Sequence, residues 1–299
     1  MLKFLLDQKH RLEFLNNADP TFITYRRTLI SVMTSTYNRE PVSIVASFFK
    51  NNIYLCSLEK PQSQKKYTHS DQNYKYCAWG YKFEQYMLSD APLLIPDIEK
   101  SVIENEEFSI YYTSQLKKHK LFYGAQIDGM LATNNATKAP ESDDLNSNLS
   151  YLRNNHFVEL KTNREIHNLR QEQSFKRYKM IRCWCQCYLA GLKGLLVGYR
   201  TDDGIIQRVQ WFNTHDIVKY CWNEWDPQIA INYLDYFLSY VENSFQSLKD
   251  TCDDNFVSTE PLTLMFDIDA FQKITVSKDI SQEHVILPDW YVGSIGCNK

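Results

Sequence analysis

The sequence predicts an α/β fold, a single domain with central mixed β-sheets flanked by helices, and three observations support this prediction. Hydrophobic residues make up 43% of the chain and charged residues 23%, which is typical of a globular protein with an ordered core. Segments rich in β-branched and aromatic residues alternate with segments of helical apolar spacing. The length of 299 residues suits one mixed α/β enzyme domain, so we expect a single domain over 1–299.

The first half of the chain contains most of the strand-like segments, which are recognised by their β-branched and aromatic residues. We expect strands at 22–33, 42–49 and 52–58, with Lys50-Asn51 as a turn between the last two. Helices are expected over 76–88 and 96–118. Two more strands are expected at 121–127 and 156–162.

The second half of the chain predicts two long helices. The first runs from about Glu165 to Leu192 and ends near two glycines. Strands at 195–200 and 205–212 follow, joined through Asp202-Asp203-Gly204, which is a strong hairpin signal. Asp226-Pro227 resembles a helix cap followed by proline at the first helical position, and apolar spacing extends that helix to about Lys249. The last expected strands are 262–268 and 271–276.

One segment interrupts this pattern. Residues 133–150 are rich in Asn, Ser and Asp and contain almost no large apolar side chains. Such a composition buries too little surface to offset the entropy of ordering. Because the segment lies between two expected strands, we interpret it as a disordered hairpin insertion, not as a domain boundary.

Charge and cysteine usage exclude several classes of protein. The formal net charge is −3, yet residues 159–182 carry seven Lys or Arg against three Glu, a local excess that favours phosphate binding or marks a solvated helix face. The eight cysteines form no CxxC pair and the seven histidines no HExxH group, so zinc and disulfides are not expected. Neither a signal peptide nor an apolar run of membrane length is found, so we expect a soluble intracellular protein without membrane contact.

The sharpest local feature is the run Val158-Glu159-Leu160-Lys161. In a strand, side chains two positions apart point to the same face, so Glu159 and Lys161 point together. Alone, this pair is equally consistent with an ion pair on the surface of the protein. The preceding strand ends in Asp128, with Gln126 expected on the same face.

An acid after one strand and Glu-x-Lys on the next form the PD-(D/E)xK nuclease arrangement. Carboxylates hold a hard divalent cation through oxygen. The cation polarises the phosphate and lowers the pKa of a bound water, and the lysine offsets the negative charge that develops. The sequence therefore predicts a PD-(D/E)xK-nuclease-like core.

Five motifs together carry a resemblance to a family. They are GYKFE at 80–84, GAQID at 124–128, VELKT at 158–162, Gln186 on the expected long helix, and GYR at 198–200. In this order they resemble the DXO-type decapping exoribonuclease family, whose fungal members partner a nuclear 5′–3′ exoribonuclease. Upstream, Tyr25-Arg26-Arg27-Thr28-Leu29 resembles the family's aromatic-Arg-Gly-x-Leu motif.

The resemblance implies a role for each matched position. Glu84, Asp128 and Glu159 would bind one or two Mg²⁺ or Mn²⁺ ions, with help from the main-chain carbonyl of Leu160. Lys161 and Gln186 would place the attacking water and the scissile phosphate.

Two further residues belong to the implied substrate site. Arg26 would contact the 5′ region of the RNA, and Gln126 would lie beside the substrate. The family has Glu where this chain has Gln126, so one ligand loses its charge. Arg27 replaces the motif's glycine.

The implied function is metal-dependent hydrolysis at RNA 5′ ends. Incompletely capped, triphosphorylated and NAD-capped RNA are the implied substrates, and 5′–3′ exoribonuclease action is included. The alternatives are a catalytically weakened or inactive homologue that binds RNA 5′ ends or an exoribonuclease partner, and a DNA-directed enzyme of the same fold group. The resemblance implies a nuclear protein, while the absence of a basic localisation cluster leaves the cytoplasm open.

Overall fold

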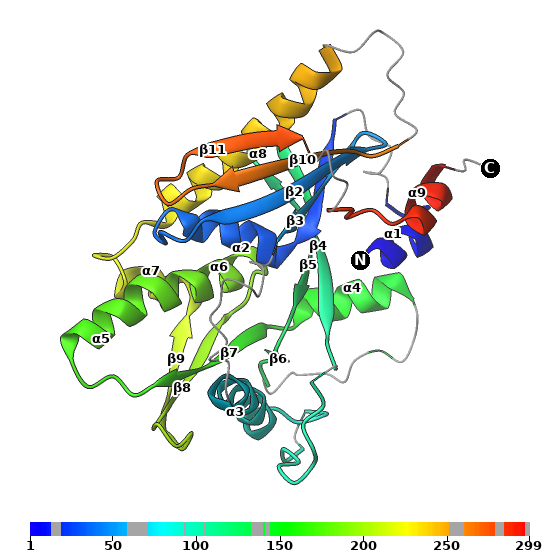
Figure 1. Cartoon of the computed structure of the whole chain (residues 1–299). Coiled ribbons are helices and arrows are strands. Elements are labelled where there is room, and N and C mark those ends of the chain that lie inside the picture. The colour runs from blue at the N-terminus through cyan, green and yellow to red at the C-terminus, as the bar shows by residue number, and fades with distance from the viewer. Residues whose placement is uncertain are drawn as a thin grey trace. The chain divides into compact units, whose positions relative to one another are not determined.

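The computed structural model describes residues 1–12, 19–58, 71–92, 94–104, 106–132, 140, 144–250, 260–278 and 284–296 (Figure 1). The chain divides into two compact units. The first comprises Met1–Lys60, Tyr111–Ala125 and Asp226–Lys299. The second comprises Pro61–Ile110 and Gln126–Trp225. The prediction of a single domain over 1–299 stays a prediction.

The first unit is built on a seven-stranded mixed sheet with the order β11-β10-β2-β3-β1-β5-β4. Strand β1 pairs in parallel with β3 and with β5, whereas β2 pairs antiparallel with β3 and β10, and β10 with β11. The strands are β1 (Thr21–Tyr25), β2 (Val42–Phe49), β3 (Asn52–Ser57), β4 (Ser109–Leu116), β5 (His119–Gln126), β10 (Leu262–Ile268) and β11 (Ile274–Lys278).

Helix α8 (Pro227–Asp250) packs on one face of this sheet together with α2 (Arg26–Ser35). Successive residues of a strand point to opposite faces. Phe48 of β2 accordingly faces Phe245 of α8, with ring centroids 5.8 Å apart, while the next residue, Phe49, packs on the other side. Phe266 of β10 lies on the α8 face and contacts Phe237 at 6.1 Å.

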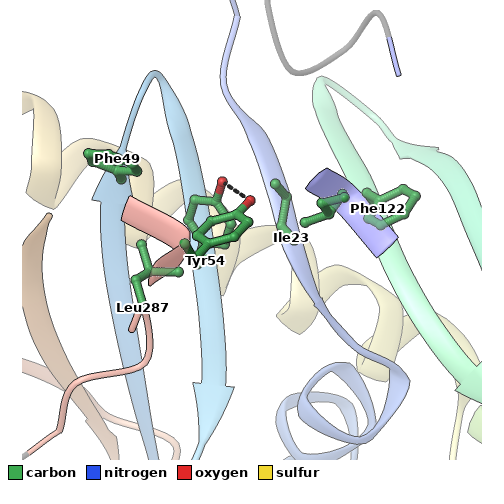
Figure 2. Packing of buried hydrophobic residues seen from close by; sticks show 7 residues of the cluster. Ile23, Phe49, Tyr54, Phe122 and Leu287 are labelled. Carbon is green, nitrogen blue, oxygen red and sulfur yellow. Dashed lines mark hydrogen bonds between the residues drawn. The ribbon is translucent and has the colours of Figure 1, made fainter. Parts of the chain in front are cut away.

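The opposite face of the same sheet is covered by α1 (Leu2–Asp7) and α9 (Asp289–Gly296). Figure 2 shows the cluster there, in which Ile23, Phe49, Tyr54 and Phe122 of the strands meet Leu287. A buried hydrogen bond of 2.9 Å joins the hydroxyl groups of Tyr54 and Tyr291. The two layers of helices therefore bury both faces of the sheet.

The second unit contains a four-stranded sheet with the order β6-β7-β8-β9. Strands β7 and β8 are parallel, and the outer pairings are antiparallel. The strands are β6 (Gly129–Met130), β7 (Phe157–Arg164), β8 (Gly194–Arg200) and β9 (Ile206–Asn213). The helices of this unit are α3 (Asp71–Met87), α4 (Leu145–Asn154), α5 (Leu169–Ser174), the π-helical turn η3 (Phe175–Met180), α6 (Ile181–Leu189) and α7 (Thr214–Tyr220).

Helix α3 packs closely on one face of this sheet because Gly198 has no side chain. Phe83 of α3 forms a buried cluster with Val158 and Leu160 of β7. A Cβ atom at Gly198 would lie 2.6 Å from the Phe83 ring, closer than real Cβ contacts come. The alternation of β7 leaves Glu159 and Lys161 on the opposite face, as the sequence predicts.

Two expected elements are wrong. Residues 26–33 form helix α2, not a strand, because Leu29, Ile30, Val32 and Met33 are all buried and α2 packs against α8; tertiary burial overrides the β propensity. The expected helix at 96–118 is instead an irregular segment followed by β4. There Gln85 donates to the carbonyls of Asp97 and Lys100, both at 2.7 Å, and these bonds hold the irregular segment.

Other elements differ in their bounds, as the long helix and strand β11 show. The long helix begins at Leu169 instead of Glu165 and contains the π-helical turn. Strand β11 starts at Ile274, not at 271, since Gln272 adopts a left-handed backbone with φ of 63°. The Lys50-Asn51 turn is confirmed, with positive φ at both residues.

The predicted insertion at 133–150 lies partly outside the described residues, which omit 133–139 and 141–143. Its last part is helical, so the expected disorder is wrong there. Helix α4 starts after Asp144, whose carboxylate accepts a hydrogen bond of 2.8 Å from the Ser147 amide. This N-cap satisfies a helix-end donor and allows a polar segment to form a helix.

None of the helices in the part of the chain that the structure describes combines the length and apolarity needed to cross a bilayer.

Truncation of Phe266 tests which contacts hold the first unit. Phe266 is fully buried among Phe237, Tyr240 and Phe245, so Phe266→Ala should lower the free energy of unfolding by about 3–5 kcal/mol through the cavity that it leaves. Phe271→Ala, at an 85% exposed site, should change it by less than about 0.5 kcal/mol. Urea denaturation measures both, and equal effects would contradict the assignment of Phe266 to the core.

Candidate active site

Four of the predicted site residues meet at the start of β7 in the second unit. Asp128, between β5 and β6, accepts a hydrogen bond of 2.8 Å from the Leu160 amide. The Lys161 ammonium donates to the same carboxylate oxygen at 3.0 Å and to the Leu160 carbonyl at 2.8 Å. It also lies 2.6 Å from Oε1 of Glu159. Lys161 therefore bridges the two carboxylates.

Gln186 approaches this group from α6. Its Nε2 donates to Oε1 of Glu159 at 2.6 Å. Glu159 is only 1% exposed, so its charge must be compensated by Lys161 and Gln186 and not by water. The position of Gln186 on α6 follows from the buried side of the helix, where Cys183 and Cys187 pack.

Glu84 belongs to the same electrostatic group although α3 supplies it from the other face of the sheet. Burial of its carboxyl and the neighbouring Asp128 carboxylate raise the pKa of Glu84 to about 7, and Glu159 adds to this rise while Lys161 opposes it. Burial removes water from this carboxyl and Asp128 adds negative charge beside it, and both effects favour its protonated form.

The charge of Lys161 is held by the same acids. Burial opposes the ammonium form, but the carboxylates of Glu159 and Asp128 raise the pKa of Lys161 above its usual range. The lysine is therefore a permanent cation here. One ammonium faces three carboxyl groups, which leaves a net negative charge.

A cavity of about 790 Å³ opens beside these acids. Glu84, Gln126 and Asp128 line one side of it, and the irregular segment after α3 lines the other. Gln126 is exposed to this cavity. Acidic side chains outnumber basic ones in the lining, which contains Glu84, Asp90, Asp97, Glu106, Glu107 and Asp128 against Lys100.

The donor set fits a hard divalent cation, because carboxylate and carbonyl oxygens are the ligands that Mg²⁺ and similar ions prefer. Glu84, Asp128, Glu159 and the Leu160 carbonyl supply such oxygens, and burial together with the Asp128 carboxylate raises the pKa of Glu84. Over the described ranges, however, no three Asp, Glu, His or Cys side chains are grouped closely enough to hold an ion. The predicted ligand set therefore stays a prediction.

Arg26 is the one predicted site residue that belongs to the other unit. It is 7% exposed at the start of α2. Its predicted contact with the RNA stays a prediction.

The sequence did not indicate the wall of the cavity. Residues 96–108 were expected to be helical, whereas 96–104 and 106–108 form an irregular segment that supplies much of the cavity's lining. The signal that could have found it is Asp97, whose side chain accepts hydrogen bonds from the amides of Glu99 and Lys100 in a turn.

An acid after one strand, Glu-x-Lys on the next, and a third acid from a packed helix define a metal-dependent nuclease of the PD-(D/E)XK class. A family model described as RAI1-like PD-(D/E)XK nuclease matches residues 1–292, and the chain belongs to this family. It is thus a nuclease, an enzyme of the hydrolase class.

Relatives and solved structures agree with this assignment. The chain is 28% identical to the bovine "Decapping and exoribonuclease protein" over 99% of its own length and 70% of that protein. The corresponding Drosophila melanogaster protein is 28% identical over 91% of this chain and 68% of its own. A crystal structure of Candida albicans Rai1 in complex with pU5 and Mn²⁺ shares the fold, with a TM-score of 0.75 at 22% identity over 98% of this chain and 78% of that one.

The raised pKa of Glu84 predicts how the metal-free protein responds to pH. The folded state keeps a proton that the unfolded state releases above about pH 4.5, so the stability from this proton is lost as pH rises through about 7. At pH 8 without metal, Glu84→Gln should therefore raise the free energy of unfolding by about 1–3 kcal/mol, and the gain should shrink at pH 5.5.

The matched control is Glu106→Gln, an exposed carboxyl in the lining of the same cavity, which should change stability by less than about 0.5 kcal/mol. Denaturant titrations at both pH values measure these differences. A loss of stability in Glu84→Gln at pH 8 would contradict a raised pKa of Glu84 in the folded state.

Proposed function

We propose that this chain hydrolyses phosphodiester bonds at RNA 5′ ends in a metal-dependent reaction and removes defective or non-standard 5′ caps. The observation that carries the proposal is the group formed by Asp128, Glu159, Lys161 and Gln186, electrostatically coupled to Glu84. Relatives over most of the chain bear the name "Decapping and exoribonuclease protein". These two lines of support are independent, because one is chemical and the other is sequence similarity.

Glu84, Asp128, Glu159 and the Leu160 carbonyl would hold a divalent cation, Mg²⁺ or Mn²⁺. When bound, such an ion polarises a phosphate oxygen and makes a bound water a better nucleophile. Gln186 orients the Glu159 carboxylate through its 2.6 Å hydrogen bond. Lys161 carries the permanent positive charge that offsets the charge developing on the phosphate.

The size of the acidic cavity supports action at an RNA 5′ end, and its charge supports a requirement for a divalent cation. Its volume of about 790 Å³ lies in the range of small-molecule sites, so it can receive a terminal nucleotide or cap. The carboxylates of its lining repel phosphate groups. A divalent cation would remove this repulsion, and RNA should therefore enter only when the ion is present.

The uncharged side chain of Gln126 bears on how many divalent cations the site would hold. An amide can coordinate through its oxygen but brings no charge, so this residue lowers the affinity for a second ion. We therefore propose one tightly bound ion. Contact with a 5′–3′ exoribonuclease and residence in the nucleus belong to the same proposal, and co-purification with tagged protein together with microscopy would test both.

Cleavage of defined RNAs tests the proposed activity. Purified protein with Mn²⁺ should release the first nucleotide or cap from 5′-labelled RNA. Glu159→Gln and Lys161→Met should each lower the rate by at least about 100-fold, because each removes one charge that the phosphate or its ion requires. Single-stranded DNA of the same sequence serves as the competing substrate.

Lys193→Met is the matched control, since this lysine is exposed on the turn before β8. It should leave the rate within about twofold. If the wild type cleaves every kind of RNA 5′ end as slowly as Lys161→Met does, the proposal is wrong. If it cleaves the DNA faster than the RNA, the enzyme acts on DNA instead.

A charge added at position 126 tests the single-ion proposal. Gln126→Glu should tighten Mn²⁺ binding by about 10–100-fold, the usual effect of a supporting ligand. Gln173→Glu places the same charge on the exposed side of α5 and should have no effect. Calorimetric titration with Mn²⁺ measures both, and equal affinities in wild type and Gln126→Glu would remove position 126 from the site.

Gln126 also favours a second candidate, a homologue that binds RNA 5′ ends with little turnover. In that case Gln126→Glu should switch on cleavage that the unmodified chain lacks. Turnover by the wild type that Glu159→Gln abolishes would exclude this candidate.

A further inference from the structure

Two aromatic side chains and one arginine form a platform on the second unit, apart from the carboxylates. Tyr76 and Trp79 belong to α3, and Arg200 is the last residue of β8. The guanidinium carbon of Arg200 lies 4.6 Å from the centroid of each ring, and the two ring centroids are 5.5 Å apart. We call these three residues the Arg200 platform.

The platform lies a few nucleotides from the candidate active site. Tyr76 precedes Glu84 by two helical turns, which corresponds to about 12 Å along α3. On the sheet, Lys161 pairs with Val197 and Arg164 with Arg200, a separation of about 10 Å. Both routes correspond to about three steps of a stacked nucleic-acid strand.

The surface of α3 between these two places is open. Gly80 lies one turn after Tyr76 and one turn before Glu84, so the three positions share one side of the helix. Apart from its chain neighbours and the nearby backbone of α3, no atom of the described residues lies within 4 Å of the place where a Cβ of Gly80 would be. A strand whose 5′ end is held at Glu84 can therefore pass over Gly80 and reach the platform.

Within the described part of the second unit, two cations near the ends of β7 and β8 lack the acidic partners that neighbouring cations have. The nearby basic residues pair with acids: Arg164 with Asp202, Lys176 with Glu172, Arg177 with Glu224 and Arg208 with Glu165. Among the described residues, no carboxylate lies within 4.0 Å of Arg200 or Lys179.

The hydrogen bonds that Lys179 and Arg200 make go to neutral main-chain carbonyls. Lys179 donates to the Thr162 carbonyl, and Arg200 donates through one terminal nitrogen to the Thr201 carbonyl. The Nε of Arg200 is buried without an acceptor in the described part of the chain. Burial lowers the pKa of Lys179, and the nearby cations Lys161 and Arg200 contribute to this. Such uncompensated cations favour a bound anion.

We propose that the Arg200 platform, with Lys179, binds the RNA strand about three nucleotides downstream of the cleaved bond. A base stacks on Tyr76, which is 40% exposed, and phosphates pair with Arg200 and Lys179. Stacking on a ring and pairing with phosphate read no base identity, so the platform holds RNA of any sequence. This inference rests on the proposed action at RNA 5′ ends and adds the path of the strand that leaves the site.

Binding of 5′-phosphorylated, 3′-fluorescein RNA of two and eight nucleotides tests the platform, measured by anisotropy with Ca²⁺ in place of Mg²⁺ or Mn²⁺ so that the acidic lining is neutralised. The length of the RNA recovered after each measurement verifies that nothing is cleaved. Tyr76→Ala should weaken octamer binding by about 5–150-fold, the usual effect of losing one stacked base. The ratio of octamer to dinucleotide affinity should fall with it. Tyr76→Phe should retain octamer binding, because it keeps the ring.

The matched control is Tyr74→Ala, on the same helix and 77% exposed, which should bind the octamer as the wild type does. Arg200→Gln should also reduce the slope of log affinity against log salt by about 0.7, the effect of one lost phosphate contact on a single strand. Thermal unfolding of each variant reports whether α3 remains folded.

The outcomes separate this inference from the proposed activity. If octamer binding depends on Tyr76 but no RNA is ever cleaved, the activity fails and the platform stands. If the wild type cleaves RNA while Tyr76→Ala binds both lengths as the wild type does, or weakens both equally, the platform is overturned. Failure of Tyr76→Phe to retain binding, or failure of the wild type to bind the octamer, overturns it as well.

Discussion

The ammonium of Lys161, held between the carboxylates of Asp128 and Glu159, is the interaction on which the second unit's site depends. These two acids, whose side chains are 9% and 1% exposed, would repel each other without a cation between them. The lysine links Asp128, which lies just before β6, to the start of β7, and Gln186 then ties α6 to the Glu159 carboxylate. One ammonium and one amide therefore hold three segments of the second unit together.

Much of this group could be predicted from the sequence because strand periodicity is local. Glu159 and Lys161 share a face in any β-strand, and β7 forms where its apolar neighbours predict it. The proximity of Glu84 to Asp128 was different, since nothing local links α3 to the segment that carries Asp128. Only the order of several motifs indicated it, and the structure supports their proximity through the shifted pKa of Glu84.

The parts that could not be predicted are those in which distant contacts overrule local preference. Residues 26–33 carry β-branched side chains but form α2, because α8, which is some two hundred positions later in the chain, buries one side of it. The irregular cavity wall is held by hydrogen bonds from Gln85, a residue of another element. A window of neighbouring residues contains neither α8 nor Gln85, so no pattern within the window could have revealed these outcomes.

The missing side chain at Gly198 has a consequence for how such a site evolves. Helix α3 approaches the sheet closely there, with the Phe83 ring against the backbone of Gly198, and Glu84 is the next residue along the helix. The position of the Glu84 carboxyl therefore depends on the side-chain volumes at positions 83 and 198, which lie outside the group of carboxylates. Mutational drift at 83 and 198 would have to be concerted, a larger residue at one compensated by a smaller at the other, for the enzyme to keep its spacing.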